Sequence, residues 1–207
     1  MAIFTAQVAN YFGLGNTPTR YPDGSWILNQ LCCKLGRYRI KITLNRLLSE
    51  VSSWKGKQVH TAQLEVCGVR TFSEGKRITQ DVCALLSFIS MSQVVAFEYS
   101  FNGVFKSYSV RGVVMHYRPV LDTADSDMVV TFLQQVWKNY QRLKYKRKLY
   151  AVLDMVTFFD APSRPLELKL SQVFIVMENL KGTYAHVNSI PFAGVFFRKV
   201  SSPQSQT

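Results

Sequence analysis

The spacing of the apolar residues changes once along the chain, and this change constrains the fold more than any other feature. In residues 37–44, Tyr38, Ile40, Ile42 and Leu44 alternate with polar side chains, which is the period of a half-buried strand with a basic outer face. Beyond residue 125 the apolar residues follow helical spacing instead, at Val129, Phe132, Leu133, Val136, Tyr140, Leu143 and Tyr150. The chain therefore predicts a β-rich first part followed by helices.

The β-rich part contains one strong turn signal. Asn102-Gly103 separates two strand-like runs, 94–101 and 104–110, and both turn residues favour positive φ, so a hairpin is expected there. Residues 59–69 and 113–117 fit further strands. Residues 79–90 predict a helix that packs on the sheet, because the capping residue Thr79 precedes apolar residues at helical spacing.

The second part predicts two or three helices. One begins after Ser163 as N-cap, with Pro165 in its first turn, and runs from Leu166 to about Leu180 before Gly182 ends it. The expected fold class is α+β, with an N-terminal antiparallel β-sheet and one packed helix, then a C-terminal set of helices. We expect a β-rich region at 1–122, a helical region packed on it at 123–190, and a tail or the start of a linker at 191–207.

Composition favours a folded protein of the cytoplasm. A hydrophobic fraction of 47% with 18% charged residues is ordinary for a globular chain of 207 residues. The N-terminus lacks the pattern of a signal peptide, and the longest apolar run, 82–97, is shorter than the roughly 20 residues that a membrane helix needs. We expect no membrane contact. The cysteines lack zinc-ligand spacing, which predicts free thiols in a reducing compartment for Cys32, Cys33, Cys67 and Cys83.

Positive charge is concentrated in one segment of the second part. The chain has a formal net charge of +12, and residues 138–150 contain no acidic residue. Six cations lie there: Lys138, Arg142, Lys144, Lys146, Arg147 and Lys148. The apolar spacing predicts one helix over 128–153, with Lys138, Arg142, Lys146 and Lys148 mostly outside its apolar stripe.

This basic helix is the candidate contact with an anionic partner, RNA or DNA first of all. The cations would contact phosphates, while Tyr145 or Tyr150 would stack on an unpaired base. An acidic protein partner and a merely solvated basic face remain the alternatives. Tyr140 and Tyr150 fall on the apolar stripe, so we expect simple electrostatic contact rather than stacking.

No other motif predicts a metal, a cofactor or catalysis. Asp122, Asp125 and Asp127 lack the glycine and distal glutamate of a calcium loop, so we expect them to cap a helix. Gly13 and Gly15 lack the third glycine and the lysine of a phosphate-binding loop. The histidines are far apart and suggest packing or surface positions: His60, His116 and His186.

Five short motifs carry a resemblance to a known group of proteins. They are Phe132-Leu-Gln-Gln-Val-Trp-Lys-Asn-Tyr140, Lys148-Leu-Tyr-Ala-Val-Leu-Asp154, Pro165-Leu-Glu-Leu-Lys169, Met177-Glu-Asn-Leu-Lys181 and Ile190-Pro-Phe-Ala-Gly-Val-Phe-Phe-Arg198. Through them the chain resembles the middle region of uncharacterised bacterial proteins that continue into a helical HEPN domain. The resemblance implies a targeting or regulatory region whose nuclease half is missing or encoded separately.

In that group, an Arg and a His separated by four to six residues on the C-terminal HEPN helix are the usual ribonuclease signature. Arg111 and His116 satisfy the bare spacing, but they lie in a β-branched run just before Arg118-Pro119, where a helix is not expected. The chain is therefore expected to be a non-catalytic module that binds an anionic partner. A structural or protein-interaction domain is the alternative, and a nuclease acting through Arg111 and His116 is a third.

Overall fold

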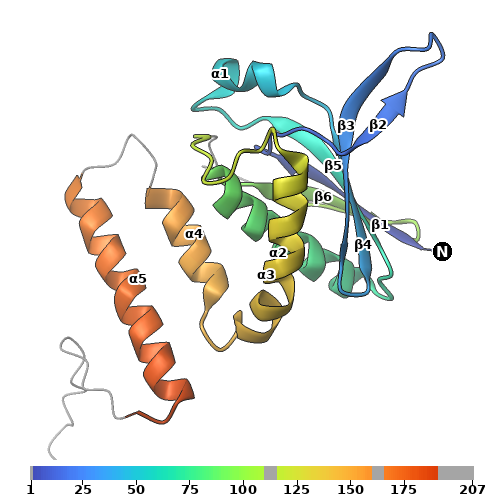
Figure 1. Ribbon diagram of the computed structural model, residues 1–207. Coiled ribbons are helices and arrows are strands. Elements are labelled where there is room, and N and C mark those ends of the chain that lie inside the picture. The colour runs from blue at the N-terminus through green and yellow to red at the C-terminus, as the bar shows by residue number, and fades with distance from the viewer. Residues whose placement is uncertain (1, 110–115, 160–165, 191–207) are drawn as a thin grey trace, which may run out of the picture.

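The computed structural model describes residues 2–109, 116–159 and 166–190 and has an α+β fold (Figure 1). Its strands are β1 Ile3–Ala9, β2 Thr17–Arg20, β3 Trp26–Leu35, β4 Tyr38–Leu44, β5 His60–Cys67, β6 Val95–Phe101 and β7 Val104–Ser107. Its helices are the 3-10 turn η1 Leu48–Glu50, then α1 Val51–Trp54, α2 Phe72–Ser90, α3 Ser126–Leu143, α4 Leu149–Phe159 and α5 Leu166–Val187. The predicted fold class is confirmed.

The strands form one antiparallel sheet in the order β2-β3-β4-β5-β1-β6-β7. Alternation of side chains sets its register. Ile42 lies opposite Leu31 on one side and opposite Leu64 on the other, and all three side chains are 0% exposed. One face of the sheet thus carries the apolar residues of several strands, and that face holds the core.

The hairpin predicted at Asn102-Gly103 is confirmed. It joins β6 to β7, and its two turn residues have φ of 48° and 79°. Both values lie in the left-handed region, which glycine enters without strain and asparagine tolerates. This turn fixes the pairing of Phe101 with Val104.

Helix α2 packs on the sheet as expected, but it begins seven residues earlier than predicted. Its N-cap is Thr71, whose hydroxyl accepts a hydrogen bond from the Glu74 backbone N–H. Thr79 is buried in the middle of the helix. The predicted start was wrong because the first two turns of α2 carry polar residues and Gly75, which hide the helical period.

Helix α3 belongs to the same hydrophobic core as the sheet and α2. Val129, Leu133, Trp137 and Tyr140 are buried in it, and the Phe132 ring stacks on Phe88 of α2. Helices α4 and α5 lie farther from the sheet (Figure 1), with α4 against α2 and α5 against α4. The helices therefore extend from the sheet in successive layers, and α5 is the outermost.

Helix α5 does not end near Gly182, as the sequence predicted, but at Val187. Its end is formed by Ser189, with φ of 53°, and by a hydrogen bond from the Ile190 N–H to the Ala185 carbonyl. Glycine inside a helix lowers stability without ending it, and the last carbonyls decide where the chain turns. The predicted N-cap Ser163 and residues 113–115 of a predicted strand lie outside the described residues.

The two outer strands of the sheet are β2 and β7. Strand β2 has four residues, includes Pro18, and shifts register between Thr17 and Pro18. Strand β7 also has four residues, and its centre carries Phe105 and Lys106. Both edge strands are short, and β2 is also irregular.

Two further findings concern the helices and the cysteines. None of the described helices is long and apolar enough to cross a membrane. The four cysteines carry no disulfide bond; Cys83 is buried, and the other three are partly buried.

Candidate nucleic-acid interface

The basic segment is not one helix, so the prediction of a continuous helix over 128–153 was wrong. Helical hydrogen bonds persist to Arg147, whose N–H donates to the Leu143 carbonyl. Lys148 then takes a φ of 48°. The N–H groups of Lys148 and Leu149 donate back to the carbonyls of Tyr145 and Lys144, which is the Schellman arrangement at a helix end. A new helix, α4, begins at Leu149.

The physical reason for this break lies at Lys148 and Leu149. Glycine usually takes the left-handed position of a Schellman motif, and here a lysine does, so no turn residue marks the site in the sequence. Leu149, the next residue, packs against the main core. Burial of this leucine offsets the strain at Lys148 and directs α4 back onto α2.

The structure separates the six cations by exposure. Lys138, Arg142, Lys146 and Lys148 are exposed, Arg147 is half-buried, and Lys144 is buried. Residues 138, 142, 145 and 146 are spaced by about whole turns, so their side chains share one side of the helix end. We call Lys138, Arg142, Lys146 and Lys148 the basic surface.

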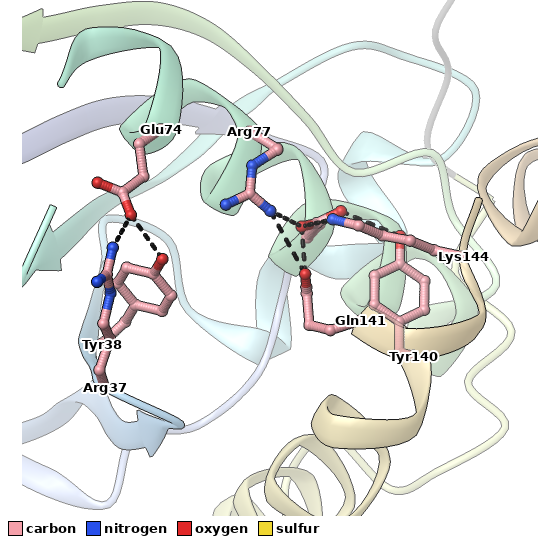
Figure 2. Close-up of polar contacts among 8 residues, drawn as sticks. Arg37, Tyr38, Glu74, Arg77, Tyr140, Gln141 and Lys144 are labelled. Carbon is pink, nitrogen blue, oxygen red and sulfur yellow. Dashed lines mark hydrogen bonds and ion pairs between the residues drawn. The ribbon is translucent and has the colours of Figure 1, made fainter. Parts of the chain in front are cut away.

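Lys144 is directed toward α2 rather than into solvent (Figure 2). It is 6% exposed, and its Nζ donates to Asp81 Oδ2 at 2.5 Å. Gln141 Nε2 donates to the same oxygen at 2.9 Å, and the Tyr140 hydroxyl donates to Asp81 Oδ1. The sequence grouped Lys144 with the ligand-binding cations, whereas the structure uses it to neutralise a buried carboxylate of α2.

Arg77 completes this group from the solvent side. Its guanidinium lies 3.7 Å from Asp81 Oδ2, and its own side chain is 41% exposed. Burial, followed by the charge of Asp81, raises the pKa of the Tyr140 phenol above its ordinary value. Tyr140 therefore stays neutral and donates to the carboxylate.

Two exposed tyrosines flank a groove beside the basic surface. The groove has a volume of about 280 Å³ and is lined by Arg77, Gln80, Asp81, Tyr140, Lys144, Tyr145 and Tyr150. Tyr145 is 74% exposed and Tyr150 is 56% exposed. Because both rings are open to solvent, they offer flat surfaces next to positive charge, which is the combination that suits an unpaired base.

A second cavity, of about 210 Å³, shares Gln80 and Tyr150 with the groove and lies between α2, the start of β6 and α4. Asp154 lines it, and burial raises the pKa of this carboxyl. Burial also raises the pKa of the Cys83 thiol, to about 12. Cys83 is therefore an unreactive thiol here.

A separate polar cluster fixes the N-terminal end of α2 (Figure 2). Glu74 accepts hydrogen bonds from the Arg70 backbone N–H at 2.7 Å, from the Tyr38 hydroxyl at 2.7 Å, and from Arg37. These donors, the Arg70 N–H first, lower the pKa of Glu74 to about 2. The cluster joins β4 to α2 and lies apart from the basic surface.

The acidic segment before α3 caps the helix, as expected. Asp125 is the N-cap of α3 and accepts from the Met128 N–H at 2.9 Å, while Asp122 accepts from the Ala124 N–H. Within the described residues, no group of three or more metal-ligating side chains exists. Asp125 therefore caps α3, Asp122 forms the turn before it, and Asp127 lies in its first turn.

The described histidines each have contacts in their own part of the chain. Arg111 lies outside the described residues, and the backbone N–H of His116 donates to Ser92 Oγ at 3.4 Å. His60 is near Asn45 and the Ala62 carbonyl. His186 lies in the last turn of α5.

Comparison with known proteins gives no match: no family model, no curated protein and no solved structure is similar to this chain. The chemistry of the site thus stands on its own geometry. Sequence reasoning missed Arg77 and Asp81, which line the groove from α2. A buried aspartate on the apolar side of the predicted 79–90 helix was the available signal, since such a residue requires a cationic partner.

Proposed function

We propose that the protein binds nucleic acid through the basic surface at the end of α3 and the turn into α4. The observation that carries this proposal is the absence of acidic partners. Among the described residues, no carboxylate lies within ion-pair distance of Lys138, Arg142, Lys146 or Lys148. Four exposed, uncompensated cations on one helix end attract phosphates more strongly than cations already paired.

Salt dependence gives the proposal a quantitative form. Each phosphate that the protein neutralises releases counterions, so the slope of log affinity against log salt is about −0.9 per contact for duplex DNA and about −0.7 for single strands. With four cations on the surface, the slope should be no steeper than about −3.6 for a duplex and about −2.8 for a single strand. A much steeper slope would indicate a second surface.

Tyr145 adds a preference for unpaired bases. Its ring is open to solvent and lies on the same side of the helix end as the basic surface, and stacking on a base contributes about 1–3 kcal/mol. A duplex keeps its bases stacked on one another and gains nothing from this ring. We therefore expect Tyr145→Ala to weaken binding to single-stranded RNA roughly 10-fold and leave duplex DNA binding nearly unchanged.

The test is binding of labelled single-stranded RNA and duplex DNA across a salt series, with two charge-reversed variants. One variant is Lys138→Glu with Lys146→Glu, on the basic surface. The matched control is Arg20→Glu with Lys55→Glu, two exposed cations of the β-rich part, with the same change in net charge. Loss of binding in the first variant alone supports the proposal, and equal binding in both would contradict it.

The alternative that the sequence left open, a protein-interaction domain, gains one observation. Helix α5 carries several exposed apolar residues, among them Leu170 and Met177. Protein-interaction modules expose such residues, and nucleic-acid ligands do not need them. Location in the cytoplasm and association with a HEPN-type protein likewise stay predictions.

A further inference from the structure

Helix α5 carries an exposed apolar stripe with heptad spacing. The six positions follow intervals of three and four residues and are all apolar and exposed: Leu170, Val173, Met177, Leu180, Tyr184 and Val187. This is the spacing of the a and d positions of a coiled coil. The stripe extends over about 25 Å at 1.5 Å per residue. Such a length of exposed apolar surface is unusual on a helix at the surface of a protein.

The buried part of α5 has a mixed character. Val176 and Ala185 are buried, but Gln172 Oε1 and Asn179 Oδ1 are also buried and, within the described residues, have no hydrogen-bond partner. A helix that docks only on α4 would place its apolar residues at that contact and its amides in water. The stripe therefore leaves α5 with apolar side chains available for a second contact.

We propose that this stripe pairs with the same stripe of a second copy of the chain, in antiparallel orientation. When two copies of α5 meet around a two-fold axis between Glu178 and Asn179, position 170 opposes 187, 173 opposes 184, and 177 opposes 180. Every member of the stripe then meets another member. A self-complementary surface of this kind is what a two-fold interface requires.

Electrostatic repulsion between two copies is weakest at this helix. The chain has a net charge of +12, so most of its surface repels another copy. Residues 166–187 contain two lysines and two glutamates, and one of these lysines, Lys181, lies beside Glu178. Two copies therefore meet with the least repulsion along α5. An acidic partner protein is not favoured there, because α5 has no excess of positive charge.

The test measures the mass of the full chain by sedimentation equilibrium over a wide concentration range. We expect a dimer of 23.7 kDa chains. Met177→Glu buries two charges beside the axis and should weaken dimerisation about 30-fold or more. Ile175→Glu is the matched control, because Ile175 lies on the other side of the same helix and is 51% exposed, against 63% for Met177.

Cysteine cross-linking tests the orientation. Leu170→Cys with Val187→Cys should yield a covalent dimer under mild oxidation, while Leu170→Cys alone and the unchanged chain, with its four native cysteines, should not. Cross-linking by Leu170→Cys alone would mean parallel pairing and would overturn the proposal. A chain that stays monomeric at all concentrations would also overturn the proposal. If the chain is monomeric and Met177→Glu unfolds it, the chain's own residues cover the stripe.

Discussion

Lys144 of the helix end and Asp81 of α2 are 63 residues apart in the chain and form a buried ion pair, with Nζ and Oδ2 separated by 2.5 Å. This pair fixes the end of α3 against α2. Since the helix continues for only three more residues, the pair also fixes the direction in which Tyr145 and Lys146 point. The basic surface is thus held in place by the one lysine of the segment that does not face solvent.

Breaking this pair should lower stability strongly. Lys144→Met leaves Asp81 buried with Gln141 and Tyr140 as donors and only the partly exposed Arg77, 3.7 Å away, as a cation, so we expect the free energy of unfolding to fall by about 3 kcal/mol. Urea denaturation measures this change in the free energy of unfolding. Lys146→Met, at an exposed position, should change stability by less than about 0.5 kcal/mol. Equal effects of the two substitutions would mean that the ion pair does not hold the helices together.

Glycine should have opposite effects at two neighbouring lysines. Lys148 has a φ of 48°, so Lys148→Gly relieves strain and should raise the free energy of unfolding by about 1 kcal/mol. Lys146 lies within the last helical turn, and Lys146→Gly should lower it by about 1 kcal/mol. Thermal denaturation of the two variants in parallel checks the signs, and the same sign for both would contradict the Schellman assignment.

The stability of the protein should depend on pH through Glu74. Its pKa is lowered from 4.5 to about 2 in the folded chain, so its contribution is complete above the unfolded value of about 4.5 and is lost as pH falls towards 2. We expect the unchanged protein to lose stability faster than Glu74→Gln over that interval. Urea midpoints measured from about pH 6 down to about pH 3 test this, and parallel curves would show that the Arg70, Tyr38 and Arg37 contacts do not stabilise the carboxylate.

Gly75 should tolerate no side chain. Replacing a helical glycine with alanine ordinarily raises stability by about 1 kcal/mol. Here the added methyl group would collide with the Phe4 ring, which is fully buried, so Gly75→Ala should lower the free energy of unfolding by about 1–3 kcal/mol. Combining it with Phe4→Leu should recover part of the loss, whereas additive losses would place the strain elsewhere.

The sheet could be predicted from the sequence because its signals are local. Alternation in β4 and the Asn102-Gly103 turn each require only a few consecutive residues, and both were confirmed. The start of α2 was less visible, although Thr71 and Glu74 have the spacing of a capping box. Glu74 binds Arg70, Tyr38 and Arg37 instead of the Thr71 N–H, so its role depends on β4 as much as on the helix.

The site was harder to predict, because its main features depend on distant residues. Burial of Lys144 requires Asp81, which no local pattern connects to it. The helix break at Lys148 depends on the packing of Leu149 against the core. Lysine is common inside helices, so the sequence at this position predicts that the helix continues. At Gly182 the opposite happened: the sequence predicted a helix end, but this glycine lies inside α5. Exposure of Lys138, Arg142 and Lys146, by contrast, followed from the helical period alone.

The short outer strands of the sheet bear on how copies of this protein associate. Pro18 offers no N–H for pairing and lies at a register shift in β2, and Lys106 places a charge in the middle of β7. Proline, irregularity and lysine at a sheet edge all oppose the addition of a strand from another molecule. Growth into fibrils by edge-to-edge pairing is therefore disfavoured, so association through a helix would stop at a closed complex of defined size.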